Sequence, residues 1–340
     1  MRAYRLYAPH DARLVEIDEP EPGLGEVLLR VLAAGVCHSD LNVHDGLAGA
    51  AWDLPYTLGH EVCAEVVAQG PGVSGPAPGE RVLVHGPLGC GSCRRCAAGD
   101  ENICVRRPST AFGIGLGTDG GMADLLVTDA RRLVPAGALD PVAAAPLTDA
   151  ALTSMHAVSS CRPPVEGDTV VVVGAGGLGH LAIQILRALT AATVVAVDVR
   201  PEARELAADC GAHHVADAGA DVDRIVRKVS GGRGADAVLD FVVTPPTVEM
   251  SASLLSTAAD LVLVGSGGGE VRISKPGTLP PDTRVSVPSW GTRDELARLV
   301  ALAQGGDIAT ETTAFPLDAA DTAFAELRRG GVRGRAVLVP

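Results

Sequence analysis

The stretch that most constrains the fold lies at residues 169–198, near the middle of the chain. An apolar run, TVVVV, is followed by GAGGLG, by the helix-like HLAIQILRAL and by a second apolar run, TVVAV. Further apolar runs follow at AVLDFV, LVLVGS and RVSVP. Short, nearly continuous apolar runs that alternate with helical stretches predict a parallel sheet covered by helices on both faces. We therefore expect an α/β fold class with a doubly wound sheet.

GAGGLG has the G-x-G-x-x-G spacing of a dinucleotide-binding turn. One glycine permits the tight turn, one lets the backbone approach a pyrophosphate, and one lets the helix pack closely on the strand. A glycine-rich turn that binds nothing is the alternative in a chain with 41 glycines. The preceding strand, the following helix and an acid about 20 residues further on, Asp198, favour nucleotide binding. The predicted cofactor-binding residues of the turn are Gly174, Gly176, Gly177, Leu178 and Gly179.

Asp198 also bears on the choice of cofactor. A carboxylate at the end of the second strand accepts hydrogen bonds from ribose hydroxyls and repels a 2′-phosphate. Arg200, two residues on, is the reservation, because it offers such a phosphate a partner. We predict NAD rather than NADP.

The first part of the chain has a different pattern. EVLLRVLAAGVC, EVCAEVVAQG and ERVLVHG are short runs separated by turns rich in glycine and proline. This pattern predicts a β-rich barrel or sandwich. The character changes near residue 148, and the tail ends in another strand-like run, GRAVLVP.

Charge and hydropathy exclude several classes of partner. The formal net charge is -13, and basic residues do not cluster, so we expect neither nucleic acid nor an anionic membrane as a partner. The apolar runs are too short to cross a bilayer, and the first twenty residues lack the apolar core of a signal peptide. We expect a cytoplasmic protein.

Four of the eight cysteines lie within fifteen residues, in CGSCRRCAAGDENIC. The two-residue gaps let neighbouring thiolates converge on one tetrahedral ion, and four sulfurs leave no open coordination position. An iron–sulfur cluster is the rival, but a second cluster-binding run and a terminal Cys-Pro are missing. The predicted ligands of a structural zinc are Cys90, Cys93, Cys96 and Cys104.

A second metal site is predicted from separated segments. A catalytic zinc needs three protein ligands and one open position. Cys37 in GVCHSD and His60 in LGHE are two candidates, and Asp149 in APLTDA is the candidate for the third.

At this point the chain resembles the zinc-dependent medium-chain alcohol dehydrogenases over residues 25–340. The resemblance is carried by the ordered set GVCHSD, LGHE, the cysteine lobe, APLTDA, GAGGLG and the terminal GR. It implies a GroES-like β-rich catalytic domain at 1–148, with the zinc lobe at about 88–106. It further implies a Rossmann NAD-binding domain at 149–287 and a return to the catalytic domain at 288–340.

The resemblance also implies roles for single residues. Cys37, His60 and Asp149 match the catalytic zinc ligands, although the third position is commonly Cys in the family. Asp40 matches the carboxylate that orients the ligand histidine, Glu61 the acid beside it, and Ser39 the hydroxyl that passes on the substrate proton. Many members carry a histidine where this chain has Asn42, and His44 is the nearest substitute.

Three further residues are expected at the substrate or the cofactor. Trp52 and Trp290 are two of few aromatics, at 3% of the chain, and we expect both to line the substrate pocket. Arg335 resembles the family's C-terminal arginine that binds the pyrophosphate, with Arg333 as the alternative.

These features predict an enzyme with one catalytic zinc, one structural zinc and NAD, which interconverts small alcohols with ketones or aldehydes. The resemblance favours medium-sized secondary alcohols. A polyol or pathway-specific dehydrogenase is the alternative, and a non-catalytic binding protein is the rival from another class. The resemblance also implies a homodimer or homotetramer, with RVSVP as the edge strand through which two sheets join.

Overall fold

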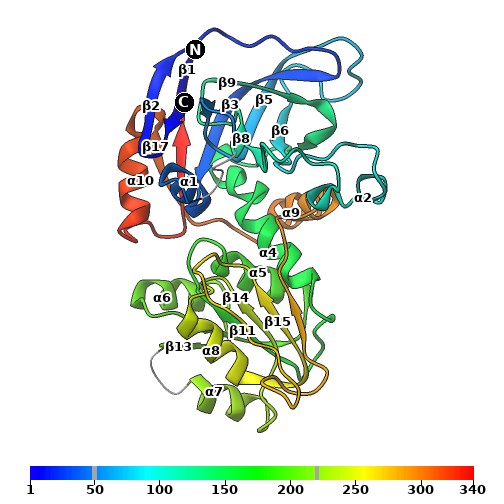
Figure 1. Ribbon diagram of the computed structural model, residues 1–340, viewed down its shortest axis with the longest axis vertical. Coiled ribbons are helices and arrows are strands. Elements are labelled where there is room, and N and C mark those ends of the chain that lie inside the picture. The colour runs from blue at the N-terminus through cyan, green and yellow to red at the C-terminus, as the bar shows by residue number, and fades with distance from the viewer. Residues whose placement is uncertain (48–51, 219–221) are drawn as a thin grey trace. The chain divides into compact units, whose positions relative to one another are not determined.

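The computed structural model describes residues 1–47, 52–218 and 222–340. They form two compact units, both drawn in Figure 1. Unit 1 comprises Met1–Leu152, Trp290–Gln304 and Thr310–Pro340; unit 2 comprises Thr153–Ser289 and Gly305–Ala309. The division after Leu152 differs from the predicted boundary at 148/149, which assigned Asp149 to the nucleotide-binding domain. The structure places Asp149 in unit 1, where its side chain contacts Cys37 and His60.

Unit 2 is built on a parallel six-stranded sheet in the order β13-β12-β11-β14-β15-β16. The strands are β11 (Thr169–Val173), β12 (Thr193–Val197), β13 (His214–Ala216), β14 (Ala235–Asp240), β15 (Leu255–Leu263) and β16 (Arg284–Ser286). The helices of this part are α5 (Gly179–Leu189), α6 (Pro201–Asp209), α7 (Val222–Val229) and α8 (Pro245–Leu254). Figure 1 shows helices packed along the sheet. The predicted doubly wound α/β sheet is confirmed.

The valine-rich runs explain this sheet. All five residues of β11 are buried, as a central strand with helices on both faces requires. Val171, Val195, Val238 and Leu261 come from four neighbouring strands and belong to one core cluster. Branched side chains suit such a pleated, buried surface.

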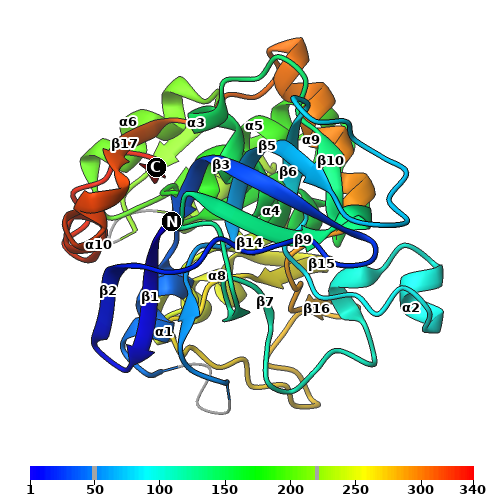
Figure 2. The ribbon, with the colours of Figure 1, turned by 90° about the horizontal axis from the view of Figure 1, so that it is seen from above.

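The described residues of unit 1 form three sheets. The largest has seven strands, in the order β10-β6-β5-β3-β18-β17, with β9 also paired to β3. Its strands are β3 (Glu26–Val36), β5 (Glu61–Gln69), β6 (Arg81–Val84), β9 (Leu125–Asp129), β10 (Leu133–Pro135), β17 (Thr312–Pro316) and β18 (Arg335–Val339). The smaller sheets are formed by β1 (Arg2–Ala8), β2 (Asp11–Glu16) and β4 (Tyr56–Thr57), and by β7 (Gly113–Ile114) and β8 (Gly117–Thr118). Figure 2 looks onto the long strands β3 and β5.

The C-terminal tail completes the large sheet. β18 lies antiparallel to β3 and parallel to β17, so the end of the chain becomes a buried strand of unit 1. The remaining helices are α1 (His38–His44), α2 (Arg94–Ala97), α3 (Pro141–Ala144), α4 (Ala150–Ser159), α9 (Arg293–Gly305) and α10 (Ala320–Arg328). Within the described ranges, the helices are all too short or too polar to span a membrane.

Candidate active site

The register of β3 and β5 brings the first two predicted ligands together. Gly35 pairs with Glu61 across these antiparallel strands, so Cys37 just beyond β3 and His60 just before β5 lie at the same end. Gly35 is required here, because a Cβ at this position would lie 2.1 Å from Glu61 Oε2. Cys37 is also the N-cap of α1, and its backbone amide donates to Asp40 Oδ2 at 2.8 Å.

Asp149 completes a cluster of possible ligands with Cys37, His60 and Glu61, which we call the mixed cluster. Asp149 Oδ2 lies 3.6 Å from Cys37 Sγ and 3.4 Å from His60 Nε2. In a tetrahedral zinc site, neighbouring ligand atoms lie about 3.3–3.8 Å apart. His60 Nδ1 faces Asp40 Oδ1 at 3.1 Å, which leaves Nε2 for the metal, as in the common carboxylate–histidine–zinc arrangement. The geometry of these three side chains fits a zinc ion.

The charge of the site also favours a cation. Asp40 and Glu61 are fully buried, and Arg335, itself buried, forms an ion pair with Glu61. Burial raises the pKa of Glu61, an effect that the guanidinium of Arg335 opposes. Burial lowers the pKa of His60, but Asp40 and Asp149 outweigh it and raise the value well above the ordinary one. A buried set of acids of this kind is stabilised by a bound cation.

Arg335 lies in the candidate site rather than on the surface of a nucleotide turn. The sequence resemblance implied a contact with the cofactor pyrophosphate, whereas the structure pairs the side chain with Glu61, 274 positions away. Arg333, the alternative, is half exposed beside Glu311, at 3.5 Å. The pyrophosphate contact stays a prediction.

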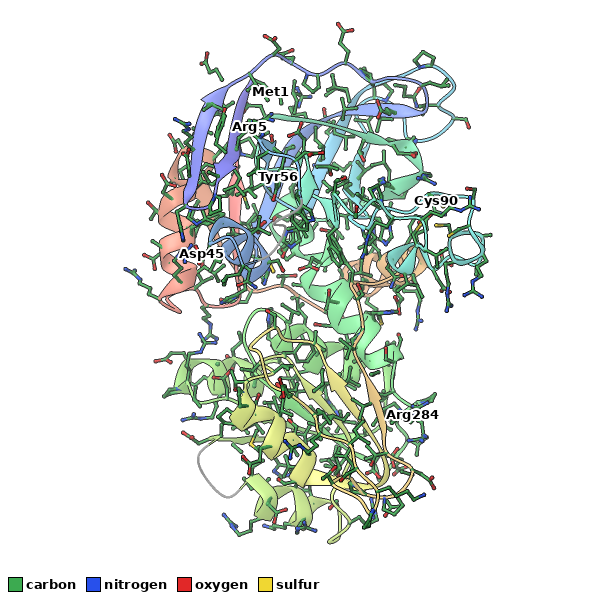
Figure 3. The ribbon with its side chains drawn as sticks, viewed as in Figure 1. Met1, Arg5, Asp45, Tyr56, Cys90 and Arg284 are labelled. Atoms are coloured by element: carbon green, nitrogen blue, oxygen red, sulfur yellow. The ribbon has the colours of Figure 1, made fainter. Side chains whose placement is uncertain are left out.

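The helix α1 separates the predicted proton-relay residues. Ser39 Oγ lies 3.7 Å from Cys37 Sγ, and Asn42, three residues on, shares its side of the helix. His44 is five residues on and has other partners: its Nδ1 lies 3.0 Å from Asp45 Oδ1 and 3.1 Å from Arg328 Nη2. Figure 3 labels Asp45 at this end of α1. The structure therefore does not bring His44 to Ser39.

Trp290 contacts the mixed cluster directly. Its ring meets that of His60 edge-on at 5.6 Å between centroids, and its Nε1 donates to the carbonyl of Thr148 at 2.9 Å. The ring of Phe112, which sequence reasoning missed, stacks on that of Trp290, with 5.7 Å between the ring centroids. The ring of Trp52 meets that of Tyr56 edge-on, with 6.3 Å between the centroids, and this pair is separate from the stack of Trp290 and Phe112. Whether either tryptophan lines the substrate pocket stays a prediction.

The four predicted cysteines of the lobe form the second cluster, the four-cysteine cluster. Sγ–Sγ distances are 3.5 Å (Cys93–Cys96), 3.8 Å (Cys93–Cys104) and 3.9 Å (Cys90–Cys96), against about 3.8 Å for a tetrahedral zinc–thiolate site. Cys90, labelled in Figure 3, lies beside α2. The core of this lobe consists of the cysteines themselves.

The protonation of these thiols also points to a cation. The backbone amides of Ser92 and Cys93 lower the pKa of Cys90 to about 5. Burial, followed by the neighbouring sulfurs, raises that of Cys96 to about 12. Four adjacent sulfurs thus cannot all ionise unless a cation binds between them.

In unit 2 the glycine turn has the expected form. Gly174 has a φ of +85°, and a Cβ on Gly179 would lie 1.9 Å from the Gly174 carbonyl, so the close approach of α5 to β11 needs glycine. Asp198 Oδ2 accepts the amide of Ala175 at 2.9 Å, and Oδ1 accepts that of Arg200 at 2.9 Å. Each oxygen keeps a lone pair for a ribose hydroxyl. The turn therefore fits a dinucleotide.

Comparisons with known proteins agree with this geometry. The family model of the alcohol dehydrogenase GroES-like domain matches residues 23–138, and that of the zinc-binding dehydrogenases matches residues 177–305. An NAD-dependent alcohol dehydrogenase of Sulfurisphaera tokodaii is 34% identical over 100% of both chains. The crystal structure of an Aeropyrum pernix alcohol dehydrogenase superposes with a TM-score of 0.93 at 35% identity, over 100% of both chains. The structure of an acetophenone reductase of Geotrichum candidum in complex with NAD superposes with a TM-score of 0.87 at 28% sequence identity. The match covers 100% of this chain and 97% of that one.

This chain belongs to the zinc-dependent medium-chain alcohol dehydrogenases. It is an oxidoreductase that acts on CH–OH groups of small molecules, with zinc and NAD as cofactors.

Proposed function

We propose that the enzyme oxidises medium-sized secondary alcohols to ketones with NAD, and catalyses the reverse reaction. The observation that carries the proposal is the mixed cluster, in which a carboxylate, Asp149, stands with Cys37 and His60 beside the buried ring of Trp290. The similarity to an acetophenone reductase supports a ketone as the oxidised partner, since acetophenone is a ketone.

In this proposal Cys37, His60 and Asp149 hold the catalytic zinc. When bound there, zinc acts as a Lewis acid that polarises the substrate oxygen and lowers the pKa of the alcohol. Asp40 keeps the proton on His60 Nδ1, so that Nε2 presents its lone pair to the cluster. The pair with Arg335 holds Glu61 at the base of the site.

The proton of the alcohol leaves through Ser39, whose hydroxyl lies at the edge of the cluster. Asn42 shares the same side of α1 but has an amide, which does not titrate near neutral pH. Asn42 therefore orients a water or hydroxyl rather than taking the proton, and the final acceptor is solvent.

The four-cysteine cluster holds the structural zinc and closes the lobe around it. Asp198 gives NAD its preference over NADP. The strand β16 lies at an edge of its sheet, and we propose that two copies pair there as a dimer, which light scattering tests directly. A cytoplasmic location stays a prediction.

A substrate panel tests the proposal. NAD-linked turnover of 2-butanol and cyclohexanol should exceed that of primary alcohols and polyols, and should disappear in Cys37→Ala with the fold retained. Replacing NAD by NADP should lower kcat/KM. Preference for a polyol, or equal efficiency with the two cofactors, would overturn the corresponding part of the proposal.

A further inference from the structure

The turn that follows β14 has an unusual backbone. Val243 has a φ of +56°, a left-handed conformation that β-branched residues rarely adopt. Its side chain is buried, with 6% exposed. Strained residues of this kind persist only where the surrounding structure holds them, and they concentrate at functional sites.

The side chain of Asp240 holds this turn. Its Oδ1 accepts hydrogen bonds from the backbone amides of Val242 at 2.9 Å and Val243 at 2.8 Å. Its Oδ2 accepts the hydroxyl proton of Ser251, from α8, at 3.3 Å. Asp240 is fully buried, so the two amides would be left without an acceptor if this carboxylate were removed.

The turn at Val242 and Val243 also supports the loop 264–269, which follows β15. The amide of Gly267 donates to the Val242 carbonyl at 3.1 Å, and that of Gly269 donates to the Val243 carbonyl at 2.7 Å. A Cβ on Gly265 would lie 2.4 Å from the Val242 carbonyl oxygen. These hydrogen bonds join the turn and the loop into one piece.

This piece lies against the nucleotide-binding turn. The amide of Phe241 donates to the Val173 carbonyl at 2.8 Å, and Val242 Cγ2 lies 2.6 Å from the position of a Cβ on Gly174. The Val242 side chain is nevertheless 36% exposed. β11 and β14 are adjacent in the middle of the sheet. From β11 the chain adds β12 and β13 toward one edge, and from β14 it adds β15 and β16 toward the other. Dinucleotides bind at the carboxyl ends of strands at such a switch point.

We propose that Asp240 is a positioning residue for NAD. By accepting the amides of Val242 and Val243, it holds the strained turn in place and presents Val242 beside Gly174 as an apolar wall of the cofactor site. The inference depends on NAD binding alone, and not on the proposed alcohol or the zinc ligands.

The test combines three substitutions with direct NADH titration by fluorescence. Asp240→Ala should raise the Kd of NADH and the KM for NAD about tenfold, while kcat changes less than about threefold. Asp240→Asn keeps an acceptor oxygen for both amides and should restore Kd to within about threefold of the wild type. Ser251→Ala removes only the bond to Oδ2, so it should lower the apparent Tm without changing Kd.

A second pair of variants covers the case in which Asp240→Ala does not fold. Val242→Ala should weaken NADH binding by about threefold or more. The matched control is Val215→Ala on β13, where 38% of the residue is exposed, and it should leave NADH binding unchanged. The proposal is overturned if Asp240→Ala or Val242→Ala binds NADH like the wild type. It is equally overturned if Asp240→Asn is as weak as Asp240→Ala, or if Ser251→Ala raises Kd.

Discussion

The two metal-binding clusters of unit 1 are assembled in opposite ways. The four-cysteine cluster comes from a single fifteen-residue segment, and its sulfurs supply most of the buried material of the lobe. The mixed cluster joins Cys37 to Asp149, 112 positions away, at the buried ends of two long strands. We therefore expect the order of the lobe to depend on its metal, and the mixed cluster to be held in place by the sheet.

The difference in ligands matches this difference in assembly. Four thiolates close a tetrahedral ion and leave no position for a substrate. In the proposed catalytic site, Cys37, His60 and Asp149 would leave one position open. Asp40 contacts the ring of His60, and Arg335 pairs with Glu61 beside it. The comparison predicts that damage to the mixed cluster abolishes activity, and that damage to the four-cysteine cluster lowers stability.

The largest expected effect is on catalysis. His60→Ala should lower kcat/KM for a secondary alcohol by roughly 10³-fold or more, because the metal loses a ligand while the sheet keeps its fold. Steady-state kinetics and circular dichroism check this. Cys63→Ala alters a buried cysteine on β5, the strand that His60 precedes, outside both clusters, and should stay close to the wild type. A His60→Ala enzyme with near-normal activity would remove the catalytic role of the mixed cluster.

Cys96→Ser should act mainly on stability. The lobe has little core besides its cysteines, so loss of its metal should lower the apparent Tm by roughly 5 °C or more and open the lobe to proteolysis. Scanning calorimetry and limited proteolysis measure both. Cys210→Ser, in unit 2, serves as the control. An unchanged Tm together with lost activity would reverse the assigned roles of the two clusters.

Asp40→Asn should give an intermediate effect. The amide weakens the polarisation of His60 and no longer offers an acceptor to both His60 and the Cys37 amide, so activity or zinc affinity should fall about 10–100-fold. Asp45→Asn at the other end of α1 should leave activity and zinc affinity within about twofold of the wild type. Equal losses in the two variants would mean that α1 as a whole, rather than Asp40, supports the site.

The last expected effect is confined to acidic pH, and it arises where the lobe meets the loop that contains Trp290. The His85 ring bonds to the Gly291 carbonyl at 2.8 Å and faces Glu101 of the lobe at 3.8 Å, and burial lowers its pKa to about 4. As the pH falls from 6.5 to 4, the unfolded chain gains a proton that the folded protein does not. Stability should therefore fall by up to about 3 kcal/mol over this window.

Urea unfolding at pH 7 and pH 5 measures the contribution of His85 to the pH dependence of the free energy of unfolding. His85→Gln keeps a donor for Gly291 and removes the titration, so the loss of stability between the two pH values should shrink. An identical pH dependence in this variant and the wild type would contradict the assignment.

Features set by local sequence could be predicted, and features set by distant contacts could not. The spacing of Cys90–Cys104 and the glycines of 174–179 each determine a short piece of structure. In contrast, the pairing of Arg335 with Glu61 depends on how β18 enters the large sheet. Likewise, the role of Asp240 became visible only with the left-handed backbone of Val243.

Two further differences have the same origin. The sequence offers His44 as a substitute for a relay histidine at the position of Asn42, but two residues along a helix turn a side chain by about 200°. It therefore contacts Asp45 and Arg328. The change in composition predicts a domain boundary near residue 148, whereas unit 1 extends to Leu152 and includes Asp149. No local pattern reports such contacts.

The zinc content of the purified wild type and of Asp149→Ala shows directly whether the mixed cluster holds a zinc ion. We predict about two zinc ions per chain in the wild type, and one in the variant, which should keep its Tm and lose alcohol oxidation. One zinc per chain in an active wild type, or two in an inactive Asp149→Ala, would contradict the assignment of the mixed cluster as the catalytic zinc site.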